Sequence, residues 1–233
     1  RYLSNRKGYD IPYNMLCRAD SLGQLTAAGK RVKEEVKYII DETEGRWGDL
    51  SGIGKRQHRD IARRMVERFP EVFQGAARIE AHSTTVNRCI LSMGSFLQQL
   101  TALNPRLEVT LDANRENMFY MNYQDKQLRD SMVTPTTRKA YEAFCDPIEH
   151  NPRLMDMLFV CPDSVAKVVN EVDLNYYIIK TGIIQQNTNL GSKTDLIDLF
   201  SYEELHQFWQ KENAWWYFMY GPSPLNGGCQ PST

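Results

Sequence analysis

The chain has 233 residues, which is enough for one large domain or two small ones. Its 42% of apolar and 24% of charged residues are typical of a globular protein. With a net charge of −1, it lacks the overall basic field that favours binding to nucleic acid or to an anionic membrane, and no apolar run approaches the ~20 residues of a transmembrane helix. An anion-binding site must therefore be local.

The first elements in chain order are an irregular segment and a helix. Gly8, Pro12 and Gly23 interrupt residues 1–24, which we expect to be irregular. A helix is predicted from Thr26 to about Thr43, because apolar residues recur there at three- and four-residue spacing.

The next helix is predicted between residues 50 and 70, where Pro70 ends it. One face carries five arginines. They are Arg56, Arg59, Arg63, Arg64 and Arg68. Such a face is compatible with an anion patch, but a solvated helix surface is the favoured interpretation.

A strand, a polar turn and an amphipathic helix are predicted over Arg78–Leu100. Ile79 and Ala81 alternate with polar neighbours, as in a strand. The small hydroxyl residues of His82–Thr85 suit a turn and a helix N-cap, and apolar residues then recur at helical spacing from Val86 onward.

Arg88 lies in the first turn of that predicted helix. A cation is unfavourable there, because the helix N-terminus already carries partial positive charge. A basic residue at a strand-to-helix turn therefore indicates a bound anion. The alternative is that Arg88 points into solvent or pairs with a nearby carboxylate, and position alone favours this alternative.

The chain changes character after about Asp112. Leu107–Leu111 alternates as a second strand, and helical periodicity dominates afterwards. The expected helices are Thr136–Cys145, Pro152–Phe159, Ser164 to about Ile184, and Tyr202–Tyr220. Strands that alternate with helices favour an α/β layer with a mostly parallel sheet. Two strands are too few for an independent sheet, so we expect further sheet-forming sequence beyond one or both ends.

Many aromatic residues occur in the last predicted helix. They are Phe208, Trp209, Trp215, Trp216, Tyr217, Phe218 and Tyr220. A surface that stacks on sugars or other rings is conceivable, but a packed helical core is the favoured interpretation.

The five cysteines do not indicate a metal site. They are Cys17, Cys89, Cys145, Cys161 and Cys229, with no C-x-x-C pair and no histidine at zinc spacing. We expect no cofactor. A disulfide is possible, with Cys145 and Cys161 the nearest pair, and buried thiols fit equally well.

Of the four histidines, only His82 adjoins the strand-to-helix turn. His58 and His206 lie on charged helices, where a surface position is favoured, and His150 lies in a turn bounded by prolines. A histidine at position 82 can act as a base or contact phosphate, although a structural hydrogen bond is the commoner role.

The order of these segments resembles one branch of the histidine phosphatase superfamily, which contains acid phosphatases, phytases and multiple inositol polyphosphate phosphatases. Gly48–His58 is similar to its G-x-L-T-x-x-G-x-x-Q segment, and Arg68–Pro70 to the R-Y-P that follows. Arg78–Leu100 is similar to its S-T-x-x-x-R-x-x-x-S-x-x-x-F motif. Arg1–Leu3 resembles the end of R-H-G-x-R-Y, and Gly221–Ser232 the glycine-rich segment before the second catalytic motif. The matching motif residues are Ser83, Thr84, Arg88, Ser92 and Phe96.

The resemblance implies a partial Rossmann-like α/β phosphatase core in residues 1–112, a large all-α cap in 113–220, and a return linker in 221–233. In this family a histidine attacks phosphorus and forms a phosphohistidine, which water hydrolyses. Arg1 and Arg88 match two phosphate-binding arginines of the catalytic centre, and His82 is a weaker candidate for contact with the substrate. His82 stands where the family often has an arginine.

Neither catalytic end of the family pattern occurs in these residues. The nucleophilic histidine would precede Arg1, and the H-D or H-A-E proton donor would follow Thr233. We therefore expect part of a longer, metal-independent phosphomonoesterase that acts on inositol polyphosphates or other small phosphate esters, in the periplasm or secreted. One alternative is a non-catalytic helical binding module on a degenerate phosphatase scaffold. A weaker one is an activity like that of phosphoglycerate mutase.

Overall fold

The computed structural model describes residues 2–119, 121, 130–148, 153–189 and 196–227. They form two compact units, which we describe separately. The sheet unit contains the described residues within 1–4 and 46–123, and the helical unit those within 5–45 and 124–230. The sequence-based division at residue 112 grouped residues 5–45 with the α/β part, whereas their contacts place them in the helical unit.

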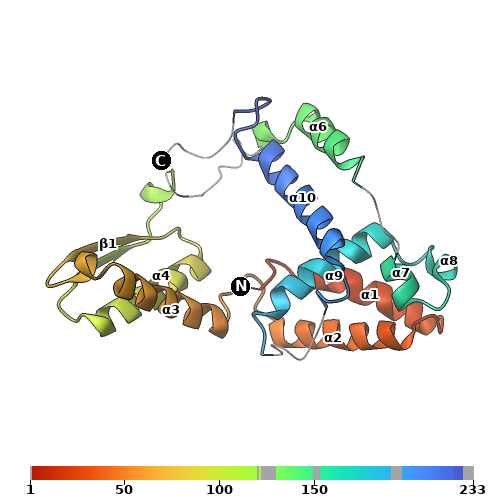
Figure 1. Cartoon of the computed structure of the whole chain (residues 1–233), viewed down its shortest axis with the longest axis horizontal. Helices are drawn as coiled ribbons and strands as arrows, with labels where there is room; N and C mark the ends of the chain where they lie inside the picture. The colour runs from red at the N-terminus through yellow and green to blue at the C-terminus, as the bar shows by residue number, and fades with distance from the viewer. Residues whose placement is uncertain (1, 120, 122–129, 149–152, 190–195, 228–233) are drawn as a thin grey trace. The chain divides into compact units, whose positions relative to one another are not determined.

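The sheet unit is built around a parallel strand pair, β1 (Arg78–His82) and β2 (Glu108–Asp112), which α4 (Asn87–Leu103) connects (Figure 1). Both predicted strands are therefore present. The register pairs Arg78 with Glu108 and His82 with Asp112, so the carboxyl ends of both strands lie together. The unit also contains α3 (Gly52–Arg68) and two 3₁₀ turns, η1 (Pro70–Phe73) and η2 (Glu116–Phe119).

A small apolar core joins α3, α4 and the strands. Its buried members are Ala62, Phe73, Leu97, Leu100 and Leu107. The helical periodicity of α4 accounts for this burial, because its apolar residues recur on the face that packs on α3. The opposite, arginine-rich face of α3 is largely exposed, and its Arg63 pairs with Glu67 one turn away, as expected for a solvated surface.

The helical unit contains α1 (Lys7–Ser21), where we had predicted irregular structure. Residues at helical spacing are buried along it, including Tyr9, Pro12, Leu16 and Ala19. This face packs on α2 (Ala27–Thr43) and α9 (Glu171–Gln185), and the three helices lie side by side in Figure 1. The prediction was wrong because burial of that face outweighs the cost of about 3 kcal/mol for a proline inside a helix.

The remaining helices are α6 (Pro135–Cys145), α7 (Arg153–Leu158), α8 (Pro162–Val165) and α10 (Tyr202–Met219). The single helix predicted over residues 164–184 is in fact divided into α8 and α9. Asn170 accounts for the break, because its side chain accepts a hydrogen bond from the backbone N–H of Asp173 and so caps α9.

The aromatic residues of α10 do not form the packed core that we predicted. Trp209, Trp216 and Tyr217 are 57%, 56% and 43% exposed. Trp215 and Phe218 do pack, against rings of α6. A helix with aromatic residues around its circumference buries only those that face a neighbour, and the described part of the chain provides few neighbours here.

The four described cysteines are free thiols, so Cys145 and Cys161 do not form the disulfide considered above, and Cys229 lies outside the described residues. None of the described helices is long and apolar enough to cross a membrane. Within the same residues, no three His, Cys, Asp or Glu side chains are grouped so that they could hold a metal ion.

Candidate functional site

The candidate site lies at the carboxyl ends of the two parallel strands. The chain leaves β1 at His82, and the backbone N–H of Ser83 donates to the carbonyl oxygen of Asp112 at 2.9 Å, which ties the turn to the end of β2. In parallel α/β sheets, ligands bind beyond these strand ends, because the connecting turns and helix N-termini meet there. The topology therefore places the polar turn where a ligand is expected.

The N-terminus of α4 has no side-chain cap. Its N-cap residue is Val86, so the predicted capping by the preceding hydroxyl residues is wrong, and the first turn contains no acidic residue. Ser83 instead donates its hydroxyl to the carbonyl of Thr84, at 2.9 Å. The Thr84 hydroxyl oxygen is buried and has no hydrogen-bond partner among the described residues. A buried hydroxyl of this kind, beside free helix N–H groups, is suited to an anion or an ordered water.

Arg88 is half-buried in the first turn of α4. Its side chain has no ion pair or hydrogen bond within the described part of the chain. A β-carbon built on Gly48 would lie 3.7 Å from Nη1 of Arg88 and 3.7 Å from Cα of Ser4. The guanidinium therefore lies beside the loop at Gly48, which also adjoins Ser4, and no described carboxylate pairs with it.

Two backbone hydrogen bonds fix the start of the chain beside that loop. The Tyr2 N–H donates to the carbonyl of Asp49 at 3.2 Å, and the Gly48 N–H donates to the carbonyl of Leu3 at 2.7 Å. Tyr2 is 2% exposed, and the Arg46 guanidinium lies 5.0 Å from its ring centroid. The structure thus brings Arg88 close to the segment that resembles the end of R-H-G-x-R-Y. Arg1 itself lies outside the described residues, so its role as a phosphate ligand stays a prediction.

Several residues of the Gly48–His58 motif have structural explanations. Gly48 has a positive φ of 80°, which a side chain rarely tolerates. The Ser51 side chain accepts a hydrogen bond from the Gly54 N–H at 3.1 Å and so caps α3. A β-carbon on Gly54 would lie 2.7 Å from the Leu50 side chain. These residues build the loop beside Arg88, and the motif therefore marks a scaffold more than a set of reacting groups.

Replacing Gly48 with alanine should lower the unfolding free energy of the sheet unit by about 1 kcal/mol, because a left-handed backbone is strained for a residue with a β-carbon. Space for the methyl group exists at an ordinary contact distance from Arg88, so any binding of phosphate by this side chain should not change. Urea denaturation and a phosphate titration measure the two quantities. Gly52→Ala is the matched control, since Gly52 has open space and an ordinary φ. A loss of phosphate binding in Gly48→Ala would contradict this structural role.

His82 lies in a neighbouring groove of about 630 Å³, which is also lined by His58, Thr84, Cys89 and Ser92. Its side chain is exposed, and Arg88 is not among the residues that line the groove. The structure thus does not show His82 sharing a ligand with Arg88. It does bring His58 and His82 to one groove, which we did not predict. The available signal was that His58 lies one helical turn before the buried Ala62, and so faces inward.

No family model matches the sequence, and no curated protein matches it. Solved structures do resemble the fold. A phytase from D. castellii matches with a TM-score of 0.64 and 14% identity, over 94% of this chain and 48% of that one. A multiple inositol polyphosphate phosphatase from Bifidobacterium longum, in complex with inositol hexasulfate, matches with a TM-score of 0.68 and 14% identity, over 96% and 63%. This chain therefore spans about half to two thirds of the length of these structures.

Proposed function

From its histidine acid phosphatase-like fold, we propose that the chain supplies the phosphate-binding part of a phosphomonoesterase that acts on inositol polyphosphates or other small phosphate esters. The observation that carries the proposal is Arg88. It is half-buried at a helix N-terminus without a side-chain cap, and it has no carboxylate partner among the described residues. A phosphoryl group would remove the electrostatic penalty of that position.

The chemistry of phosphoryl transfer explains why an arginine suits this place. The phosphoryl oxygens carry negative charge throughout the reaction, so catalysis depends on a positive cradle and on positioning. A guanidinium is always charged and can donate to two oxygens at once. The uncapped N–H groups in the first turn of α4, which also carries Arg88, add neutral donors.

The proposal assigns the bond-breaking groups to motifs outside these 233 residues. A histidine of an Arg-His-Gly sequence would attack phosphorus, and a His-Asp or His-Ala-Glu sequence would supply the proton donor. The hydrogen bonds of Tyr2 and Leu3 to Asp49 and Gly48 support this arrangement, because residues that adjoin Tyr2 would then enter near Arg88. We propose that the protein works outside the cytoplasm, in the periplasm or secreted, as is usual in the family that the chain resembles.

We also propose that the sheet unit is part of a Rossmann-like core and that the helical unit is its α-helical cap. The parallel β1–α4–β2 connection supports the first assignment. The second is supported by the content of the helical unit, whose described residues form helices and one isolated β-bridge but no strand.

A binding experiment on the 233-residue chain tests the proposal. Titration with inositol hexakisphosphate, monitored by calorimetry and ³¹P NMR, should show binding. Arg88→Ala should raise its dissociation constant by about tenfold, which corresponds to the loss of one charge-assisted hydrogen bond. Arg56→Ala is the matched control, because Arg56 is exposed on α3. The same chain should not hydrolyse p-nitrophenyl phosphate, since it lacks both catalytic motifs. Equal losses in the two variants would contradict a specific phosphate ligand at Arg88.

A further inference from the structure

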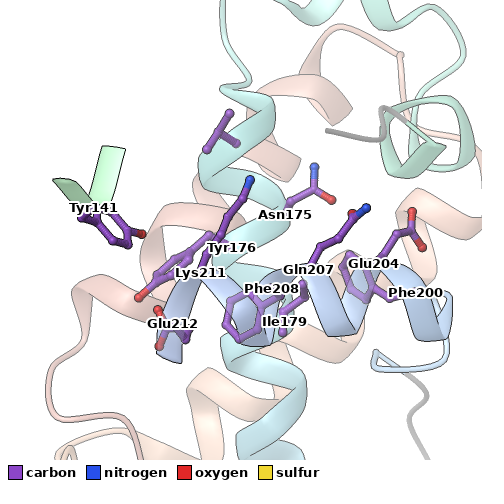
Figure 2. Close-up of a pocket in the computed structure, with 11 residues that line it drawn as sticks. Tyr141, Asn175, Tyr176, Ile179, Phe200, Glu204, Gln207, Phe208, Lys211 and Glu212 are labelled. Carbon is purple, nitrogen blue, oxygen red and sulfur yellow. The ribbon is translucent and has the colours of Figure 1, made fainter. Parts of the chain in front are cut away.

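The helical unit contains a pocket of about 210 Å³ between α9 and α10, with Tyr141 of α6 at one end (Figure 2). A cavity of about 150 Å³ is enough to hold benzene. This pocket therefore has room for a single ring with a short substituent. All of its lining residues belong to the helical unit, whereas the proposed phosphate site is made of residues of the sheet unit.

The walls of the pocket are apolar and aromatic. Ile179 and Phe200 are 4% and 7% exposed, and the rings of Tyr176 and Phe208 lie 5.8 Å apart. Burial, with a smaller contribution from Glu212, raises the pKa of Tyr176 to about 12. Its phenol therefore stays neutral at physiological pH, and the ring behaves as part of an apolar wall.

The acidic side chains that line the pocket are already neutralised. Glu204 accepts from Nη2 of Arg153 at 2.6 Å, and Glu212 pairs with Lys180. Burial alone would raise the pKa of Glu204, but its hydrogen bonds from Arg153 and Ser201 outweigh burial and lower it, so this carboxylate stays ionised and paired.

Lys211 is the cation of the lining that has no partner among the residues the structure describes. It lines the pocket and is half-buried, and no ion pair or hydrogen bond joins its ammonium group to another described residue. Gln207 lies four residues earlier on α10 and so on the same face of the helix. Figure 2 shows the polar ends of Lys211, Gln207 and Asn175 along one side of the pocket, with Ile179 and Phe208 beneath them. Counted together with Arg153 and Lys180, which pair with its two glutamates, the lining has a net positive charge, and Lys211 carries it.

We propose that this pocket binds a small aromatic carboxylate, with one ring and a short acid arm. The ring packs against the wall formed by Tyr176, Ile179 and Phe208, and the carboxylate accepts hydrogen bonds from the ammonium of Lys211 and the amide of Gln207. An apolar cavity with a few convergent polar groups is the usual form of a small-molecule site. The unneutralised cation selects an anion over a neutral or cationic ligand of the same shape.

Binding of 3-phenylpropionate to the full 233-residue chain tests this inference by calorimetry and saturation-transfer NMR. The acid should bind about tenfold more tightly than 3-phenylpropanamide, which keeps the shape and loses the charge. Lys211→Met should remove that preference and leave the affinity for the amide unchanged. Lys167→Met is the matched control, because Lys167 is exposed and does not line the pocket.

Three outcomes would overturn the inference. They are no saturable binding of the acid, equal affinity for acid and amide, and equal losses in Lys211→Met and Lys167→Met. Circular dichroism of each variant shows whether it is folded. Because Lys211 is only half-buried and its substitute has a similar length, the variant is expected to fold. A negative result for this pocket would not count against the proposed phosphate site, because that site is tested separately through Arg88 in the sheet unit.

Discussion

Replacing Arg88 with alanine should lower the turnover of a phosphate ester by about 10²- to 10³-fold in a chain that also carries both catalytic motifs, by comparison with removal of a single preorganised transition-state donor. The guanidinium beside Gly48 and Ser4 would contact the phosphoryl oxygens as charge develops on them. Steady-state kinetics with p-nitrophenyl phosphate and phytate measure the effect. Arg56→Ala on the exposed face of α3 is the control and should retain full turnover.

The same experiment separates the competing hypotheses. An unchanged rate in Arg88→Ala would show that Arg88 is only a surface residue. Phosphate binding that depends on Arg88, without turnover in a chain that contains both motifs, would instead support a non-catalytic module on a degenerate phosphatase scaffold. Arg88→Lys refines the result, because lysine keeps the charge and loses the two-pronged geometry.

Replacing Gly29 with alanine should destabilise the helical unit by about 3 kcal/mol, the upper range for overpacking. Gly29 is in the first turn of α2, and a β-carbon there would lie 2.3 Å from the carbonyl oxygen of Leu158. That atom is backbone and cannot rotate away. Thr26 holds the contact closed, because its N–H donates to the same carbonyl at 3.0 Å and its hydroxyl donates to the carbonyl of Met157 at 2.7 Å.

Urea denaturation followed by tryptophan fluorescence measures this loss, because three of the four tryptophans lie on α10. Gly94→Ala provides the control for a methyl group added inside a helix. Gly94 lies in α4 with nothing within 4 Å of the new carbon, so its replacement should stabilise the chain by about 0.5 to 1 kcal/mol. A stability of Gly29→Ala equal to the wild type would show that α2 and the end of α7 are not held in close contact.

Patterns within single elements predicted much of the sheet unit. The alternation around Ile79 and the helical period after Val86 gave β1 and α4 to within a few residues, because strand and helix geometry fix which residues share a face. The same local information identified Arg88 as a misplaced cation. It failed for α1, where Pro12 and Gly8 predict breaks, because the face that stabilises this helix is recognised only when α2 and α9 pack against it.

The candidate site was predicted in part. The sequence identified Arg88 and His82, but it could not show that one faces the loop at Gly48 while the other faces a groove shared with His58. The aromatic residues of α10 illustrate the same limit. Their composition favoured a core, yet burial depends on which neighbours are within reach, and Trp209 and Trp216 are more than half exposed.

By itself, the sequence determined both strands of the sheet unit, the near-neutral charge that makes any anion site local, and the strand-turn-helix that carries Arg88. Tertiary structure decided that, within the described residues, Arg88 has no carboxylate partner and Lys211 is left unpaired while Glu204 and Glu212 are paired. It also decided that Gly48 lies beside both Arg88 and Ser4. The physical reason is the separation in sequence over which each effect acts. Backbone geometry depends on a few neighbouring residues, so the local pattern predicts it. The partner of a charge depends on packing between segments that are far apart in the chain.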